Sequence, residues 1–193
     1  EETVTPEPAP TPEEKLEELV EAKVAAMSLE DKVMGLFIVA PEAITGVSTV
    51  IQAGEGTQQA LNQYPVGGLI YFKQNIQSEE QLKTMLENTA QYAKYPLFLA
   101  VDEEGGSVSR VAASGIGPEA GSAADIGATG NTDNAYQAGV SIGSTLSGLG
   151  FNLDFAPVAD LANVDGSIMK ERSYGADASA VSGFVTSMRA GLE

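Results

Sequence analysis

The segment 96–110 constrains the fold more than any other part of this chain. Its first half, 96–101, is an apolar run rich in strand formers that ends at three carboxylates, Asp102, Glu103 and Glu104. A run of this kind is typical of a strand buried on both faces of a parallel sheet. Parallel α/β folds build their active sites where such strands end. The sequence therefore predicts a candidate site after residue 101, with a solvated acidic turn as the alternative.

Two glycines follow the carboxylates, and an arginine closes the segment. We expect Gly105 and Gly106 to let the backbone turn sharply and to let a ligand come close. Arg110 then lies near the end of the predicted strand, where its guanidinium is a further candidate for the site.

Strand and helix signals alternate along the rest of the chain. Apolar runs predict strands at 36–40, 68–72, 97–101 and 152–157. Helical periodicity and capping signals predict helices at about 13–27, 29–35, 57–64, 78–94, 133–149 and 178–193, with a loop at 41–56. This alternation indicates a parallel sheet with right-handed crossovers. A closed barrel needs eight such units and typically ~250 residues. We therefore expect an α/β fold whose parallel βα units form about half of a TIM-type (β/α)8 barrel.

Small residues are frequent in the predicted helix 133–149. We expect them to allow close packing on the sheet: Ala138, Gly139, Gly143 and Ser147.

Composition excludes several functions. Twenty-seven acidic residues against ten basic ones give a net charge of −17, which disfavours binding to nucleic acid or to an anionic membrane. The sequence has neither cysteine nor histidine, so acid–base chemistry within it has to come from carboxylates, Lys or Tyr. No cofactor or metal is predicted, and no apolar stretch has the length of a membrane span.

The first fourteen residues form a separate region by composition. Their Pro, Thr and Glu content predicts a disordered tether over 1–14, followed by a folded domain over 15–193. A start without Met before such a tether indicates an exported protein, extracellular or at the cell surface, whose leader has been removed. A truncated cytosolic protein is the alternative.

The pattern D-E-E-G-G-x-V-x-R at 102–110 resembles the D-x-E-G-G-x-V-x-R signature of glycoside hydrolase family 3, which includes bacterial β-N-acetylglucosaminidases and β-glucosidases. Further stretches resemble the same family in the same order: 28–33, 65–72, 150–160 and 170–175. The resemblance identifies 15–193 as the N-terminal portion of the family's catalytic domain.

The resemblance implies a retaining β-glycosidase and assigns three substrate-binding residues. Asp102 would bind hydroxyls of the sugar at the non-reducing end, and Arg110 and Arg172 would donate to its oxygens. A carboxylate can accept from vicinal hydroxyls, and an arginine supplies charge-assisted donors, so the chemistry agrees. For Arg110, a salt bridge to Glu103 or Glu104 that shapes the loop is the alternative.

No catalytic residue is assigned within this sequence. The resemblance puts the nucleophile and the acid/base beyond Glu193. Retaining hydrolysis needs those two groups about 5 Å apart, whereas adjacent carboxylates at a strand end point in different directions. Asp154 and Asp160 are expected to be structural.

The expected parent activity is hydrolysis of terminal β-linked sugars, with β-N-acetylglucosaminides as the first candidate and β-glucosidase or β-xylosidase activity as alternatives. This chain would supply the sugar-binding half and would be inactive alone. Two alternatives remain: a non-catalytic carbohydrate-binding or surface-adhesion module, and a half-barrel whose exposed sheet edges pair in a homodimer.

Overall fold

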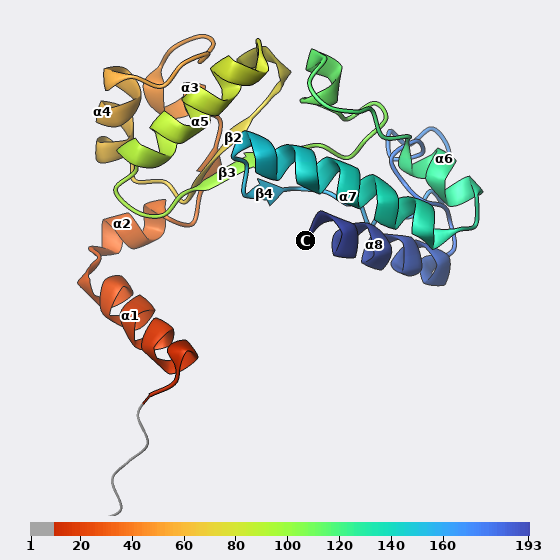
Figure 1. Ribbon diagram of the computed structural model, residues 1–193, viewed down its shortest axis with the longest axis horizontal. Helices are drawn as coiled ribbons and strands as arrows, with labels where there is room; N and C mark the ends of the chain where they lie inside the picture. Colours follow the sequence, from red (N-terminus) through yellow and green to blue (C-terminus); the bar gives the residue numbers. More distant parts are fainter. Residues whose placement is uncertain (1–9) are drawn as a thin grey trace, which may run out of the picture.

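Four parallel strands form the centre of the molecule (Figure 1). The computed structural model describes residues 10–193. The strands are β1 (Ile38–Val39), β2 (Gly68–Tyr71), β3 (Phe98–Val101) and β4 (Leu153–Asp154). They lie in the order β1-β2-β3-β4, so each strand pairs with its neighbour in the sequence. Successive βα units of a barrel wall have this order, and the predicted α/β fold with parallel βα units is confirmed.

Helices connect the strands and extend the chain on either side of the sheet. They are α1 (Pro12–Ala26), α2 (Leu29–Met34), α3 (Pro41–Thr45), α4 (Glu55–Gln63), α5 (Glu79–Tyr92), α6 (Ala123–Ala128), α7 (Thr132–Leu149) and α8 (Ala178–Leu192). Single 3₁₀ turns lie at Lys73–Asn75 and Ala112–Ser114.

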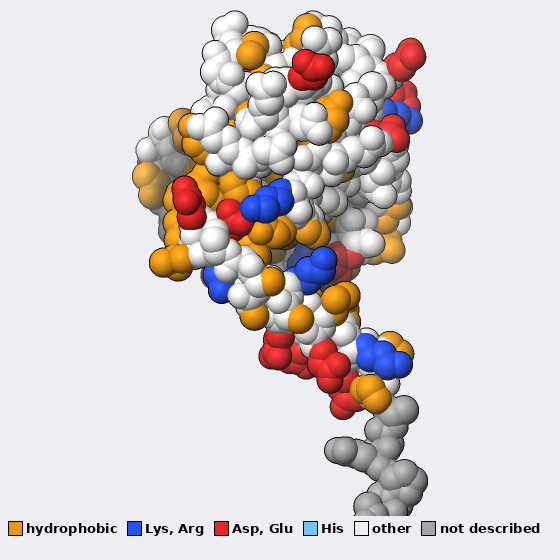
Figure 2. Space-filling view, turned by 90° about the vertical axis from the view of Figure 1, so that its left-hand side faces the viewer, with side chains coloured by type: hydrophobic (Ala, Val, Ile, Leu, Met, Phe, Trp, Pro, Cys, Tyr) orange, Lys and Arg blue, Asp and Glu red, His pale blue; other side chains and the backbone are white. Residues whose placement is uncertain are grey.

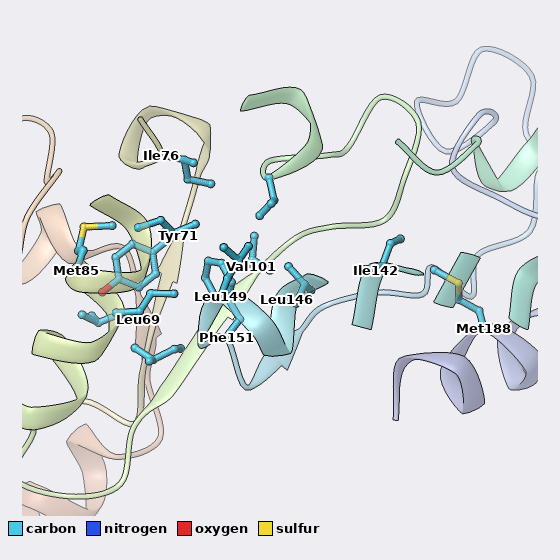
Figure 3. Close-up of a cluster of buried hydrophobic side chains, with 14 of the residues drawn as sticks. Leu69, Tyr71, Ile76, Met85, Val101, Ile142, Leu146, Leu149, Phe151 and Met188 are labelled. Carbon is cyan, nitrogen blue, oxygen red and sulfur yellow. The ribbon is translucent and has the colours of Figure 1, made fainter. Parts of the chain in front are cut away.

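One face of the sheet is buried under helices. Side chains alternate between the two faces of a strand, and one set from β2 and β3 packs against α5 and α7 (Figure 3). This core includes Leu69, Tyr71, Leu99, Val101, Leu82, Met85, Leu146, Leu149 and Phe151. Burying side chains of this size contributes about 1.5–3 kcal/mol each relative to leaving them exposed. This packing therefore holds β2 and β3 in place against α5 and α7.

The alternate set of side chains faces away from these helices, and its larger members are less covered, whereas Ala100 is fully buried. Phe98 at the start of β3 is 52% exposed, and Ile70 and Leu153 are half-buried. The outer strands β1 and β4 each pair on one side only.

The long helices α7 and α8 lie side by side (Figure 1). The small residues of α7 were expected to pack on the sheet, but Gly139 and Gly143 face α8 instead. A Cβ on Gly143 would meet Leu192 O at 2.7 Å, and one on Gly139 would collide with the Met188 carbonyl. These glycines therefore allow two helix backbones to touch.

Several predicted boundaries are wrong. The expected loop 41–56 contains α3, which begins with Pro41 and ends at Thr45, with Gly46 as its left-handed C-cap. Helix α6, capped by Ser122, was not predicted. Strands β1 and β4 are shorter than the predicted apolar runs, and only two residues of each pair with the neighbouring strand, β2 or β3.

The N-terminal region is partly helical. Residues 1–9 of the predicted tether lie outside the described residues. The prediction of disorder is wrong for residues 12–14, because α1 begins at Pro12. Thr11 and Glu14 form a capping box there. No residue of α1 is buried, and the helix projects from the body of the molecule. Figure 2 shows acidic side chains gathered along it. Between residues 10 and 193, no helix is long and apolar enough to span a membrane.

Candidate functional site

The candidate site lies where β3 ends, and its three carboxylates face three different partners. Asp102 is paired with Arg110, Glu103 with the backbone of its own loop, and Glu104 with Arg172. The strand end thus separates the groups, as expected for consecutive residues.

Glu103 is a buried structural carboxylate. Its Oε2 accepts the backbone N–H groups of Arg110 at 2.6 Å and Val111 at 2.7 Å, and its Oε1 accepts that of Ala112 at 3.1 Å. These charge-assisted bonds close the loop 103–112 and hold the backbone of Arg110 next to the end of β3. The predicted alternative of a salt bridge from Arg110 to Glu103 is wrong, since the Arg110 main chain makes the contact.

Glu104 is held by Arg172 from the loop after β4. Arg172 Nε donates to Oε2 at 2.8 Å and Nη2 donates to Oε1 at 2.6 Å. This hydrogen bonding raises the pKa of Arg172. The pair excludes Glu104 as the expected alternative partner of Arg110. It also engages two of the five N–H groups of Arg172, and Nη1 donates to Met169 Sδ at 3.5 Å.

Asp102 and Arg110 are the most open charged pair of the site. Arg110 Nη2 lies 3.8 Å from Asp102 Oδ2, which is longer than a hydrogen bond, and about a quarter of each side chain is exposed. The Arg110 guanidinium also lies over the ring of Phe72, 5.7 Å from its centroid. Asp102 is close enough to Arg172 for its charge to raise the pKa of that arginine.

Asp154 joins β4 to the strand end that carries these groups. Its Oδ1 accepts the backbone N–H groups of Glu103 at 2.9 Å and Ala156 at 3.3 Å, while Oδ2 is buried without a hydrogen bond. Burial raises the pKa of Asp154 to about 6, and the charges of Glu103 and Asp102 act in the same direction. The carboxylate of Asp154 therefore has the expected structural role. Asp160 takes part in the loop through its backbone carbonyl, which accepts from the Ser173 hydroxyl.

The two glycines after Glu104 make a tight turn, as predicted. Both have positive φ, at 90° for Gly105 and 56° for Gly106. The group that approaches them closely is another part of the chain: a Cβ on Gly105 would meet Gly121 O at 2.8 Å, and one on Gly106 would meet Ser122 Cβ at 2.8 Å. These glycines were expected to let a ligand come close. In the structure, the absence of a side chain lets residues 121 and 122 pack against them instead.

The site thus unites residues that are far apart in the sequence. The structure gathers Asp102, Arg110 and Arg172 at one end of the sheet, although it assigns Arg172 a carboxylate partner that the sequence did not indicate. Phe72 is not predicted from the sequence as a member of the site; its position directly after β2, at the same end of the sheet, is the signal that could indicate it. A carboxylate and a guanidinium with open faces can accept from and donate to hydroxyl groups. Among residues 10–193, no cluster of His, Cys, Asp and Glu side chains could hold a metal ion.

Comparison with known proteins gives a consistent result. Residues 11–193 match the family described as Glycosyl hydrolase family 3 N terminal domain. The chain is 30% identical over 175 residues to the Beta-hexosaminidase LpqI of Mycobacterium tuberculosis, covering 87% of this chain and 40% of that protein. It is 32% identical over 143 residues to a Beta-hexosaminidase of Neisseria meningitidis, covering 72% and 40%.

A solved structure shares the fold. The glycoside hydrolase family 3 beta-N-acetylglucosaminidase from Paenibacillus sp. superposes with a TM-score of 0.74 at 29% identity, covering 86% of this chain and 31% of that one. The chain therefore spans less than half the length of these relatives.

Proposed function

Because the chain belongs to the glycosyl hydrolase family 3 N-terminal domain family, we propose that it forms the sugar-binding half of a retaining β-glycosidase that hydrolyses terminal β-N-acetylglucosaminides. The observation that carries the proposal is the open pair of Asp102 and Arg110 at the end of β3. Relatives named beta-hexosaminidase and beta-N-acetylglucosaminidase support this choice of sugar.

Each charged residue then has a distinct part in binding. Asp102 accepts hydrogen bonds from sugar hydroxyls, and Arg110 donates to a neighbouring oxygen. Arg172 contributes through the N–H groups of Nη1 and Nη2 that Glu104 and Met169 do not engage. The nucleophile and the acid/base are proposed to lie outside these 193 residues, so this chain alone binds the sugar without hydrolysing it.

Binding is tested by titrating the chain with N-acetylglucosamine and following backbone amide signals by NMR. We expect weak, saturable binding that Asp102→Ala and Arg110→Ala abolish and that glucose reproduces less well. Asp165→Ala is the matched control, because Asp165 is an exposed carboxylate of the loop after β4. Equal affinity in the Asp102→Ala variant would rule out this site.

Hydrolysis is tested with the 4-nitrophenyl β-N-acetylglucosaminide and β-glucoside. We expect turnover only when the chain is extended by four further βα units, and the preferred glycoside then identifies the sugar. Turnover by the 193 residues alone would require a catalytic carboxylate among Asp102, Glu103 and Glu104. Saturable binding with no turnover in either form would favour the carbohydrate-binding or adhesion module.

We also propose that the protein is exported and tethered at a cell surface, as a secreted protein or lipoprotein. The Pro, Thr and Glu-rich composition of residues 1–11 supports this location. Fractionation of cells with an antibody to the folded domain tests it, and recovery solely from the cytosol would contradict it.

Pairing of sheet edges is proposed as a further property of the 193-residue chain. Strands β1 and β4 each have one neighbour, so their other edges are open to another strand. Sedimentation over a hundredfold concentration range should give a mass that rises toward that of a dimer. A constant monomer mass would contradict the proposal.

A further inference from the structure

The Arg110 side chain lacks the polar contacts that normally fix a guanidinium. Its Nε is buried without an acceptor, and its Nη2 stands 3.8 Å from Asp102. Arg172, by contrast, is held by two short hydrogen bonds to Glu104. Arginine has a long and flexible side chain, so ordering it costs up to about 2 kcal/mol of rotamer entropy. Another contact has to hold Arg110 in place.

That contact is the ring of Phe72. The guanidinium carbon of Arg110 lies 5.7 Å from the ring centroid, within the range of a cation–π interaction. A cation–π interaction draws on the charge of the guanidinium and uses none of its N–H groups as hydrogen-bond donors, so the Nη groups of Arg110 stay available to acceptors. An aromatic ring at this position can therefore orient Arg110 without consuming its donors.

Phe72 is itself firmly placed. Its backbone N–H donates to Asn75 Oδ1 at 2.8 Å, and Asn75 is fully buried. Asn75 Nδ2 donates in turn to Glu42 Oε1 at 2.6 Å and to Val50 O at 2.8 Å. The segments after β1 and β2 thus converge on the residue that supports Arg110.

We propose that Phe72 is a positioning residue of the sugar site: its ring holds the Arg110 guanidinium beside Asp102 so that the free N–H donors meet a sugar oxygen. The inference rests on the proposed function for its sugar-binding part. The placement of Arg110 by Phe72 stands on the contacts alone and is measured separately.

The arginine side-chain NMR spectrum measures that placement directly. The arginines of the chain are Arg110, Arg172 and Arg189, so the Nε–H signal of Arg110 is identified by its loss in Arg110→Lys. We expect Phe72→Leu to shift this signal and to speed its exchange with water, while Phe72→Tyr restores both. The Nε–H of Arg172 reports on the remainder of the site and should stay unchanged.

Affinity for N-acetylglucosamine is measured on the same variants. Phe72→Leu should weaken binding by about three- to tenfold, the range of a partly exposed cation–π contact, and Phe72→Tyr should restore it. Phe98→Leu is the matched control, because Phe98 is a half-exposed phenylalanine at the opposite end of β3. Urea unfolding verifies that each variant is folded, and Phe72→Met replaces Phe72→Leu where it is not.

An unchanged Arg110 signal in Phe72→Leu would overturn the inference. A shifted signal with unchanged affinity would overturn its sugar-binding part. Failure of the unsubstituted chain to bind the sugar would refute the proposed function instead, and the Arg110 signal would still decide whether Phe72 places the guanidinium.

Discussion

Arg172 and Glu104 are joined by two hydrogen bonds, of 2.8 and 2.6 Å, across 68 residues of sequence. The pair ties the long loop after β4 to the turn after β3. The Glu104 side chain is only 9% exposed, so water cannot replace a lost partner. Removing one member of such a pair leaves a poorly solvated charge, which costs more than the pair contributes.

Arg172→Lys should therefore lower the free energy of unfolding by about 1–3 kcal/mol, because lysine keeps the charge but loses the two-pronged geometry. Urea denaturation measures the change. The control is Arg189→Lys, whose partner Glu193 lies four residues away with both side chains 63% exposed. An exposed pair of that kind contributes less than about 0.5 kcal/mol. Equal losses in the two variants would contradict the special role of the Glu104 pair.

Glu103→Gln should destabilise the loop 103–112. The carboxylate accepts hydrogen bonds from three backbone N–H groups. In glutamine an NH₂ group replaces one of the two oxygens, so at least one backbone N–H would point at another donor and lose its acceptor. A loss of about 2–3 kcal/mol is expected from charge-assisted bonds to a buried group. Hydrogen exchange at Val111 and Ala112 should also accelerate. Glu119→Gln, at an exposed carboxylate of the same region, should change neither quantity.

Gly139→Ala should separate α7 from α8. A methyl group there would collide with the Met188 carbonyl, and helix backbone cannot yield as a flexible side chain can. We expect a loss of about 1–3 kcal/mol from overpacking, seen as a lower urea midpoint. Gly148→Ala in the same helix meets nothing within 4 Å and should instead stabilise the protein by about 0.5–1 kcal/mol through helix propensity. Destabilisation by both variants would point to α7 itself rather than to its contact with α8.

Much of the fold could be predicted because local sequence carries it. The run 97–101 has both the composition and the length of a buried strand, and β3 spans Phe98–Val101. Helix α7 starts within a residue of its predicted position and ends at the predicted Leu149, with Gly150 as its left-handed C-cap. The partner of α7 could not be predicted, because glycines allow close packing without indicating what packs there. The short helix α3 has sequence signals of its own, Pro41 at its start and Gly46 after its end, but the glycines that follow favour a loop over the whole segment.

The candidate site was predictable in its members but not in its pairing. The resemblance indicated Asp102, Arg110 and Arg172, and these side chains meet at one end of the sheet. The loop geometry decides which carboxylate each arginine faces. Glu103 sets that geometry by accepting backbone N–H groups, and such contacts cannot be predicted from a pattern of side chains. The support of Arg110 by Phe72 crosses from one strand end to the next and is likewise absent from local sequence.

Asp154 gives the protein a defined response to pH. Burial raises the pKa of its carboxyl from 3.8 to about 6, so between these values the folded chain binds more protons than the unfolded chain. Stability contributed by this group is therefore greatest below pH 4 and falls as the pH rises to about 6. The neighbouring carboxylates Glu103 and Asp102 oppose its ionisation, while its two backbone hydrogen bonds favour it.

Asp154→Asn isolates this contribution, because asparagine can accept the same backbone hydrogen bonds through its oxygen and does not titrate. The free energy of unfolding of the variant minus that of the unsubstituted chain should rise by roughly 2–3 kcal/mol between pH 4 and pH 7. Urea denaturation at intervals of half a pH unit measures it, and taking the difference cancels carboxylates that titrate alike in both chains. Asp165→Asn, at an exposed carboxylate of the loop after β4, is the control variant. A flat difference for Asp154→Asn would mean that its carboxylate is solvated and titrates near 4 in the folded protein.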